Sequence, residues 1–341
     1  MKPVAVLIRL DKIGDLVSTL PVDELQPLQE YDIQWVVSRA LGFVPDHAVP
    51  PRKYIELNRK EKWEGFVCLF RFLSETKPKV AISFQAPWWV SLALWISRVP
   101  LRGGTRSQWH SFLFLNRSLR QRRSLALQHE ADYNRDLVYY SLHKQTESVR
   151  FVAPISVPTP ILRLEPHHEV KVEKWELSPR QYIVIHPGMA GSALNWKIKN
   201  YLTLIRETKK NHVVVVTGTL ADEPWLVEIK KEFRGDSQVK ILQNSLSSAE
   251  LLGVLAHAKS VVAPSTGVLH LTASLGVRAI GIYSPVRVQS PTRWRARGSQ
   301  VVVLAPKVQC PADFECLETR CKEFYCLDNI SVQDVIDEIE N

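Results

Sequence analysis

The sequence predicts an α/β protein built from two Rossmann-like parallel-sheet domains that face a central cleft. Apolar, β-branched runs alternate with amphipathic helical segments, which is typical of a parallel, doubly wound sheet. The alternation breaks at the proline-rich residues 154–166, which have the composition of an extended connector, and then restarts. At 341 residues the chain is long enough for two domains of ordinary size.

The first half opens with a strand, a polar turn and a helix. We expect the strand over residues 2–10, the turn over residues 11–15 and the helix from Leu16 onward. The next expected elements are strands over residues 32–37 and 80–84, with a helix over residues 63–76 between them. The basic, aromatic-dotted residues 98–135 fit no predicted element.

The second half repeats this alternation. Its expected strands span residues 182–186, 213–217, 239–242, 260–263, 279–283 and 301–304. An amphipathic helix over residues 331–339 opens on a Ser331 cap. The expected organisation is an N-terminal domain (1–153), a linker (154–168), a C-terminal domain (169–328) and a last helix (329–341) that packs back on the N-terminal domain.

The positive charge is concentrated in the first half. Residues 1–150 hold 22 Lys and Arg against 15 Asp and Glu, and the remaining residues hold 22 against 20, which gives the net +9. Such a surface suits an anionic partner: nucleic acid, an acidic membrane surface or a phosphorylated glycolipid. No helix-turn-helix or RNA-binding signature accompanies the charge, so we expect no nucleic acid.

No segment has the pattern of a signal peptide or a membrane span. The apolar run over residues 4–8 is short and enters charged residues, and the run over residues 88–96 is only nine residues long. Four of the five cysteines cluster near the C-terminus, unlike a secreted disulfide scaffold. We expect a cytoplasmic protein that touches a membrane without crossing it.

The first turn is a candidate catalytic element. In open α/β sheets ligands bind beyond the carboxyl ends of the strands, so residues 9–15 should face the cleft. The turn lacks G-x-G-x-x-G, which argues against a dinucleotide cofactor. Asp15 lies near a helix start, where the dipole favours an ionised carboxylate that can act as general base. A simple helix cap is the alternative, and the turn alone favours it.

Three small-residue loops follow successive strands of the second half, and together they predict a nucleotide-diphosphate site. Glycine and hydroxyl residues let backbone N–H groups approach an anion, and a helix start adds its dipole. The alternative is a set of well-capped crossovers without a ligand. The expected donor-site residues are Gly188, Gly191, Ser192, Thr217, Asp222, Glu223, Ser265, Thr266, Gly267 and His270.

Three motifs carry a family resemblance that covers nearly the whole chain. RLDKIGDLVSTLP near the start, HPGMAGSALNW in the middle and PSTGVLHLTASLG near the end resemble glycosyltransferase family 9, the ADP-heptose:lipopolysaccharide heptosyltransferases. The resemblance implies a GT-B fold and an inverting mechanism without metal or cofactor. It also implies an ADP-sugar donor on the C-terminal half and a lipid A–core acceptor at the cytoplasmic face of the inner membrane.

The resemblance also assigns roles by position. Asp15 matches the family's proposed general base, which reverses the preference for a cap, and the loop of Ser265, Thr266, Gly267 and His270 matches the one that holds the donor diphosphate. Asp222 or Glu223 falls where an acidic residue meets the ribose. Asn244 falls near the adenine edge.

The chain departs from the family at two positions. Leu194 stands where well-known heptosyltransferases carry a lysine that offsets diphosphate charge, and Ser265 stands where they carry an aspartate. Lys197 and Lys199 are nearby substitutes at a different spacing. These departures leave the donor sugar open.

The acceptor is expected at the N-terminal half, because arginine forks suit phosphate oxygens. The expected contacts are Lys12, Gly14, Arg120, Arg122, Arg123 and His129. A solvated or membrane-facing basic surface is the alternative for the arginines, and a structural pair with Glu130 is the alternative for His129.

Cys310, Cys316, Cys321 and Cys326 lie within 17 residues, which invites a zinc hypothesis. No C-x2-C pair is present, however, so free thiols are favoured and no metal is expected. Two other functions stay open: a GT-B-shaped nucleotide-sugar epimerase, and a non-catalytic sugar-nucleotide or phosphoglycan binding protein.

Overall fold

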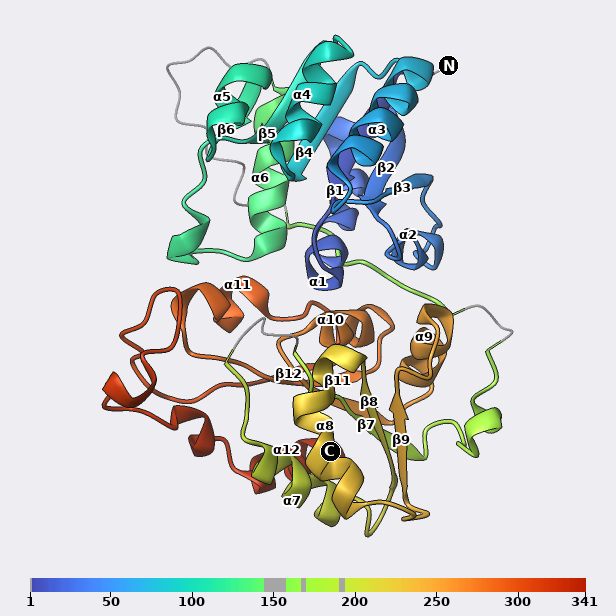
Figure 1. Ribbon diagram of the computed structural model, residues 1–341, viewed down its shortest axis with the longest axis vertical. Coiled ribbons are helices and arrows are strands. Elements are labelled where there is room, and N and C mark those ends of the chain that lie inside the picture. The colour runs from blue at the N-terminus through green and yellow to red at the C-terminus, as the bar shows by residue number, and fades with distance from the viewer. Residues whose placement is uncertain (1, 144–157, 167–169, 190–193) are drawn as a thin grey trace. The chain divides into compact units, whose positions relative to one another are not determined.

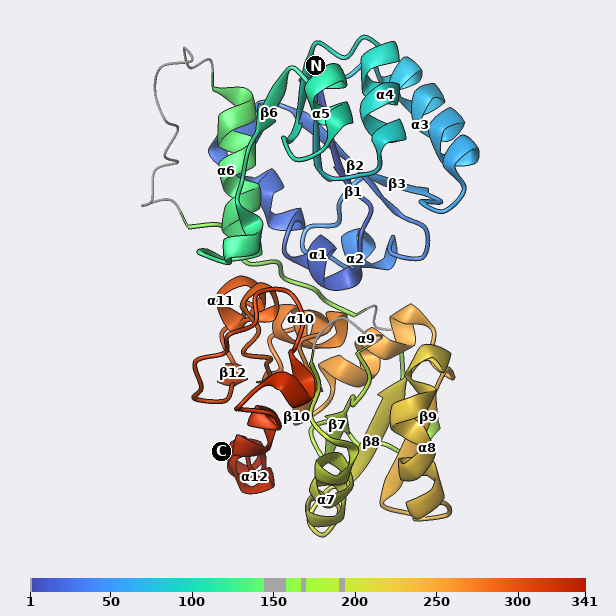
Figure 2. The ribbon, with the colours of Figure 1, turned by 60° about the vertical axis from the view of Figure 1, so that its left-hand side comes forward.

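The computed structural model describes residues 2–143, 158–166, 170–189 and 194–341. The chain forms two compact α/β units, drawn in Figures 1 and 2. The first comprises residues 1–123 and 128–162, and the second residues 124–127 and 163–341. The main boundary thus lies inside the proline-rich segment predicted as the linker.

The first unit is built on six parallel strands in the order β3-β2-β1-β4-β5-β6. This is the Rossmann order, whose switch point lies between β1 and β4, and ligands bind beyond the carboxyl ends of the strands there. The strands are β1 (Val4–Arg9), β2 (Asp32–Ser38), β3 (Tyr54–Leu57), β4 (Val80–Gln85), β5 (Leu101–Thr105) and β6 (Arg117–Leu119).

Helices cover both faces of this sheet. Adjacent glycines of β5 show the two faces: a Cβ on Gly103 would lie 2.4 Å from Ser141 of α6, and one on Gly104 would lie 2.6 Å from Leu115, beside α5. Helices α3, α4 and α5 lie side by side. The helices are α1 (Ile13–Val17), α2 (Phe43–Asp46), α3 (Lys62–Thr76), α4 (Trp88–Ile96), α5 (Trp109–Phe114) and α6 (Glu130–Leu142).

The second unit has the same plan. Its six parallel strands run in the order β12-β11-β10-β7-β8-β9, so its switch point lies between β7 and β10. The strands are β7 (Tyr182–Ile185), β8 (Val213–Gly218), β9 (Val239–Gln243), β10 (Ser260–Pro264), β11 (Arg278–Ile282) and β12 (Val301–Leu304). The helices are α7 (Ile198–Thr208), α8 (Glu223–Glu232), α9 (Ser248–Ala256), α10 (Gly267–Ser274), α11 (Pro291–Trp294) and α12 (Val332–Glu340).

The C-terminal helix differs from its prediction. The apolar face of α12 buries Val335 and Ile339 in the core of the second unit, beside α7 and β11. The expectation that this helix packs on the N-terminal domain is therefore wrong, because the apolar residues of α12 are buried in the core of the second unit.

Two local predictions are also refined. Helix α1 begins at Ile13, three residues before the predicted start, so Asp15 lies in its first turn. Residues 98–135, which fitted no predicted element, contain β5, α5, β6 and the start of α6. Among the described residues, every helix is too short or too polar to cross a bilayer.

Candidate active site

The first turn places Asp15 beyond the carboxyl end of β1. Lys12 is the N-cap of α1 and makes no capping bond through its side chain, while Asp15 occupies the third helical position. One Asp15 oxygen accepts a hydrogen bond from Nη2 of Arg9, and the carboxylate keeps 20% of its surface exposed. Asp15 is therefore more than a cap: it is an ion-paired carboxylate that solvent can still reach.

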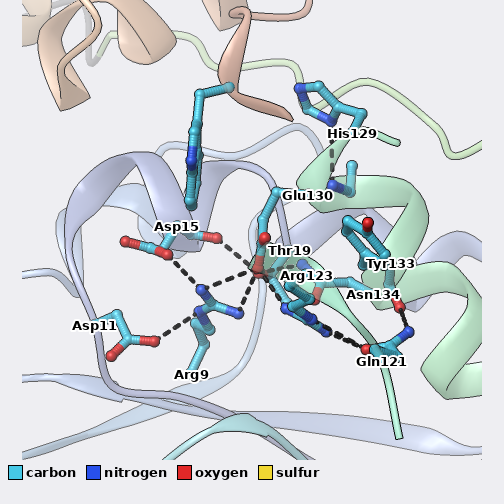
Figure 3. A network of polar contacts seen from close by, with 12 residues as sticks. Arg9, Asp11, Asp15, Thr19, Gln121, Arg123, His129, Glu130, Tyr133 and Asn134 are labelled. Carbon is cyan, nitrogen blue, oxygen red and sulfur yellow. Dashed lines mark hydrogen bonds and ion pairs between the residues drawn. The ribbon is translucent and has the colours of Figure 1, made fainter. Parts of the chain in front are cut away.

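Arg9, the last residue of β1, is the centre of the charged cluster in Figure 3. Its guanidinium is fully buried and contacts three carboxylates: Asp15, Asp11 and Glu130. Burial alone would lower the pKa of Arg9, but the three carboxylates raise it above its ordinary value. Arg9 therefore stays charged and fixes the position of the acidic groups around it.

Asp11 is the second carboxylate of the turn. Its Oδ1 accepts a 2.5 Å hydrogen bond from Arg59, and its Oδ2 lies 3.1 Å from Nε of Arg9 without hydrogen-bond geometry. Burial raises the pKa of Asp11, against the lowering effect of Arg9 and Arg59. Asp11 is thus the more enclosed of the two aspartates.

Helix α6 brings the third carboxylate from 121 residues away in the sequence. Glu130 is fully buried and pairs with Arg9, at 3.4 Å from Nη2, and with Arg123. Arg123 is held in turn by Gln121, through bonds of 2.7 and 3.0 Å to Oε1. His129 caps α6 by accepting the Ala131 N–H at 3.1 Å, a structural role that differs from the expected pair with Glu130.

The predicted acceptor residues divide into two groups. Lys12 and Gly14 lie on the same turn as Asp15, and Arg123 belongs to the buried cluster. Arg120 and Arg122 are exposed. The structure therefore brings together three of the predicted residues around Asp15 and leaves two arginines at the surface.

In the second unit the loop after β7 packs tightly on the loop after β8. A Cβ on Gly188 would lie 2.2 Å from Cγ of Asp222, so only glycine fits there. Asp222 is buried and accepts bonds from the backbone and hydroxyl of Thr219 at 2.9 and 2.8 Å. Gly191 and Ser192 lie outside the described residues.

His186 directly follows β7, and its Nδ1 lies 3.0 Å from the hydroxyl of Thr217 near the end of β8. Burial lowers the pKa of His186, against the raising effects of Asp222 and Thr217. The imidazole is therefore neutral near pH 7 and ties two neighbouring strand ends together.

The two acidic residues after β8, Asp222 and Glu223, point in different directions. Asp222 faces inward and caps its own turn, while the carboxylate of Glu223 is partly exposed and pairs with Lys230 at 2.7 Å and Gln243 at 2.6 Å. Asn244 is exposed, with a positive φ of 50°, beside Gly218. Glu223 and Asn244 are thus the more accessible polar groups of this edge.

The loop after β10 opens α10 with an unused hydroxyl. Thr266 is the N-cap but makes no capping bond, and its buried Oγ1 has no hydrogen-bond partner in the part of the chain that the structure describes. Ser265 and Gly267 flank it and are partly exposed, and His270 is buried one turn into the helix. The N–H groups of a first helical turn, the helix dipole and this hydroxyl are the kinds of group that can bind an anion.

Of the two lysines near the family position at Leu194, Lys197 is already paired and Lys199 is exposed. Leu194 itself packs against the core of the second unit. Nζ of Lys197 lies 2.6 Å from Asp328 and 3.3 Å from the ring centre of Tyr325. Lys199 is exposed on α7.

The four C-terminal cysteines line one cavity of about 180 Å³, together with Leu194, Lys197 and Asp328. All four are free thiols. Burial, followed by the three neighbouring cysteines, raises the pKa of Cys326. Within the described ranges, no group of three or more His, Cys, Asp or Glu residues has the arrangement of a metal site.

Sequence reasoning missed Arg9 and Glu130 as site residues. Arg9 could have been noticed, because a charged residue that ends an otherwise apolar strand points into the protein on the strand's alternation. Nothing in the sequence pairs Glu130 with it, since the two meet only through the fold.

Comparison with known proteins agrees with this architecture. The family model for glycosyltransferase family 9 (heptosyltransferase) matches residues 68–322. A Haemophilus influenzae protein that carries the name of a glycosyltransferase is 29% identical over 204 residues, covering 59% of this chain. The aligned part spans 58% of that relative's length.

Solved structures share the fold over the whole chain. A family 9 glycosyl transferase from Veillonella parvula is 16% identical, with a TM-score of 0.73 over 100% of this chain and 97% of its own. The ADP-heptose LPS heptosyltransferase II of E. coli is 16% identical, with a TM-score of 0.74 over 100% of this chain and 98% of its own. E. coli heptosyltransferase WaaC with ADP is 18% identical, with a TM-score of 0.68 over 99% of both chains. With two six-stranded parallel sheets in the GT-B plan and a matching family model, the chain belongs to glycosyltransferase family 9, the heptosyltransferase family.

Proposed function

We propose that this protein is an inverting, metal-independent glycosyltransferase. It moves a heptose or related sugar from an ADP-sugar to a lipopolysaccharide-core or similar glycolipid acceptor, with Asp15 as general base. The observation that carries the proposal is the reachable Asp15 carboxylate, held by the buried Arg9 at the carboxyl end of β1. The motif around it matches the family's proposed base.

The proposed reaction is one balanced displacement. The acceptor hydroxyl loses its proton to Asp15 while its oxygen forms a bond to the anomeric carbon of the donor sugar. The bond from that carbon to the diphosphate oxygen breaks on the opposite face, and its electron pair leaves with ADP. Attack opposite the leaving group inverts the anomeric configuration.

The leaving group is assigned to the start of α10. Developing charge on the diphosphate would be stabilised by the N–H groups of that terminus and by the hydroxyl of Thr266, which has no hydrogen-bond partner among the described residues. Glu223 and Asn244 are assigned to the ribose and adenine, because both are accessible at the neighbouring strand ends. Asp222 is assigned to holding the loop on which they stand.

Arg9 and Glu130 are assigned to positioning the base. Arg9 contacts Asp15 together with Asp11 and Glu130, so its guanidinium is held from several sides and fixes the orientation of the Asp15 carboxylate. Lys12 and Gly14 are assigned to the acceptor, and Arg120 and Arg122 to its phosphates.

One observation favours a second candidate, a non-catalytic sugar-nucleotide binding protein. Leu194 packs in the core where well-known family members carry a lysine, and Lys197 is paired elsewhere. The loss of that cation removes one contribution to leaving-group stabilisation.

A transfer assay separates these functions. ADP-heptose and related ADP-sugars are incubated with the protein and a lipid A–core acceptor, and products are followed by mass spectrometry and by NMR of the anomeric centre. The proposal expects an acceptor-dependent product with inverted configuration and activity that persists in a metal chelator. Donor binding without turnover supports the binding protein, and a donor-derived product without acceptor supports an epimerase.

A further inference from the structure

Helices α3, α4 and α5 of the first unit expose an unusual number of large apolar side chains. Eighteen such side chains are exposed among the described residues, and nine of them lie on these three neighbouring helices. Four of the nine are tryptophans. They are Trp63, Val67 and Phe70 on α3, Trp88, Trp95 and Ile96 on α4, and Trp109, Phe112 and Leu113 on α5.

The exposed side chains are separate from those that hold the helices on the sheet. On α3, Trp63, Val67 and Phe70 follow helical spacing, while Leu69 and Leu73 are buried on the other side. Helix α4 reads WWVSLALWI and carries no charge, so it is apolar around its whole circumference although it lies at the surface. Such a helix is normally covered by an apolar environment.

The chain segment that carries α4 and α5 is strongly basic. From residue 76 to residue 129 it contains no Asp or Glu and nine Lys or Arg, of which seven are exposed and two, Arg102 and Arg123, are partly buried. Acidic residues near the face are confined to α3 and its start: Glu61, Glu64 and Glu75. Glu64 is already paired with Arg39 at 2.7 Å.

A groove of about 460 Å³ runs between the ends of α3 and α4. Phe70 and Ile96 are its exposed apolar members, and Lys77, Lys79 and Arg98 line it as cations. Apolar side chains beside three cations are the pattern that fits a phosphate head group with an acyl chain beneath it.

We propose that the face formed by α3, α4 and α5, hereafter the three-helix face, docks on the surface of an anionic phospholipid bilayer. Tryptophan rings favour the membrane–water interface, and Phe and Leu enter the acyl boundary. The acid-free basic segment complements the negative charge of the lipids. The protein lies on the bilayer rather than in it, since its described helices are too short or too polar to span one. The inference goes beyond the proposed reaction and does not depend on it.

The test uses the full-length protein and vesicle co-sedimentation. Vesicles of phosphatidylcholine alone are compared with vesicles of phosphatidylcholine and phosphatidylglycerol in equal parts. The wild type is expected to bind the anionic vesicles, less so at high salt, because screening weakens the attraction of the basic segment. It is expected to bind the neutral vesicles only weakly.

Two variants separate the apolar and the cationic contributions to vesicle binding. Trp109→Ser with Leu113→Ser removes two highly exposed apolar side chains and is expected to weaken binding to anionic vesicles at least tenfold. Lys77→Asn, Lys79→Ser and Arg98→Asn together remove the groove cations and are expected to weaken it roughly 100-fold, at about fivefold per cation, with little change on neutral vesicles. Asparagine is chosen at 77 and 98 because both residues have positive φ.

The matched control is Val227→Ser on α8, whose side chain is 50% exposed outside the three-helix face. It is expected to bind vesicles like the wild type. All variants should keep the wild-type melting temperature and ADP affinity, because the substituted side chains are exposed and distant in sequence from the donor loops. A variant that melts early is replaced by the single substitution Leu113→Ser.

Three results would overturn the proposal. The first is a wild type that does not sediment with anionic vesicles. The second is equal binding by the wild type and both three-helix-face variants. The third is a concentration-dependent dimer in light scattering, abolished by the Trp109 and Leu113 substitutions, which would assign the face to a second copy of the chain.

Discussion

At the scale of single residues, the cluster around Arg9 determines what the first turn can do. Asp11, Asp15 and Glu130 supply three negative charges, and Arg9, Arg59 and Arg123 supply three positive ones. Buried charge is tolerated only when it is paired. Removing one member of the cluster therefore leaves a partner buried without its counter-charge, which is unfavourable. This pairing of charges explains how a fully buried arginine can lie next to the partly exposed Asp15 carboxylate.

Replacing Glu130 with Gln should therefore destabilise the fold. The change removes the shared partner of Arg9 and Arg123 and is expected to lower the free energy of unfolding by about 3 kcal/mol. Urea unfolding followed by circular dichroism measures it. The control Glu232→Gln breaks an exposed pair with Arg206 and should leave the free energy of unfolding nearly unchanged. Equal effects of the two substitutions would show that the buried cluster is not a stabilising unit.

His186 predicts how stability depends on pH. Its pKa is lowered in the folded protein, so the unfolded chain, with an ordinary value near about 6.5, binds the proton first as pH falls. Stability is thus full above that value and declines as the solution is acidified below it. His186→Asn should show a shallower decline between neutral and mildly acidic pH, measured by the midpoint of urea unfolding. An unchanged slope in the variant would exclude this histidine as the cause.

At the scale of elements, we propose that the loops after β7, β8 and β10 form the donor edge of the second unit. They are the loops around the Rossmann switch point, where Gly188 has no room for a side chain and Thr266 precedes α10 as its N-cap. Buried polar groups are normally satisfied, and the buried hydroxyl of Thr266 has no hydrogen-bond partner among the described residues, so it is the group to test for a contact with the donor.

Thr266→Val tests that hydroxyl directly. Valine keeps the shape but removes an oxygen that no described residue bonds, so thermal stability should stay the same or rise. Affinity for ADP should fall about tenfold, the size of one hydrogen bond to a charged group. Calorimetric titration with ADP and a melting curve give both values. If ADP affinity is unchanged while stability rises, the hydroxyl does not face the diphosphate.

Some strands can be predicted from the sequence and others cannot. The long β-branched runs of β7, β8, β10 and β11 are predicted well, because alternation with helices leaves few other folds for them. Strand β5 (LRGGT) and the three-residue β6 are missed, because two glycines and an arginine in β5 and the shortness of β6 remove the usual strand signal. Tertiary packing alone makes them strands.

The site is predictable to a similar degree. Asp15 and the Ser265–Gly267 loop can be identified from motifs, since both follow strands at fixed spacing. The pairing of Arg9 with Glu130 cannot, because the two residues are 121 positions apart and only the approach of α6 to β1 joins them. The sequence likewise does not show that Asp222 points inward and Glu223 outward. That difference depends on the close packing of Asp222 against Gly188.

At the scale of the whole molecule, the account assigns one task to each Rossmann unit. The first unit supplies the base, the basic acceptor surface and the three-helix face, and the second supplies the diphosphate-binding helix start. Each task rests on features within a single unit. A substitution in one unit should therefore leave the substrate of the other unit bound normally.

The most direct test of this account is Asp15→Asn, with turnover and ADP affinity measured on the same preparation. The account predicts that kcat falls roughly 10²–10⁴-fold, the usual contribution of a general base, while the dissociation constant of ADP stays at the wild-type value. Full turnover in the variant, or a loss of ADP affinity as large as the loss of turnover, would contradict it.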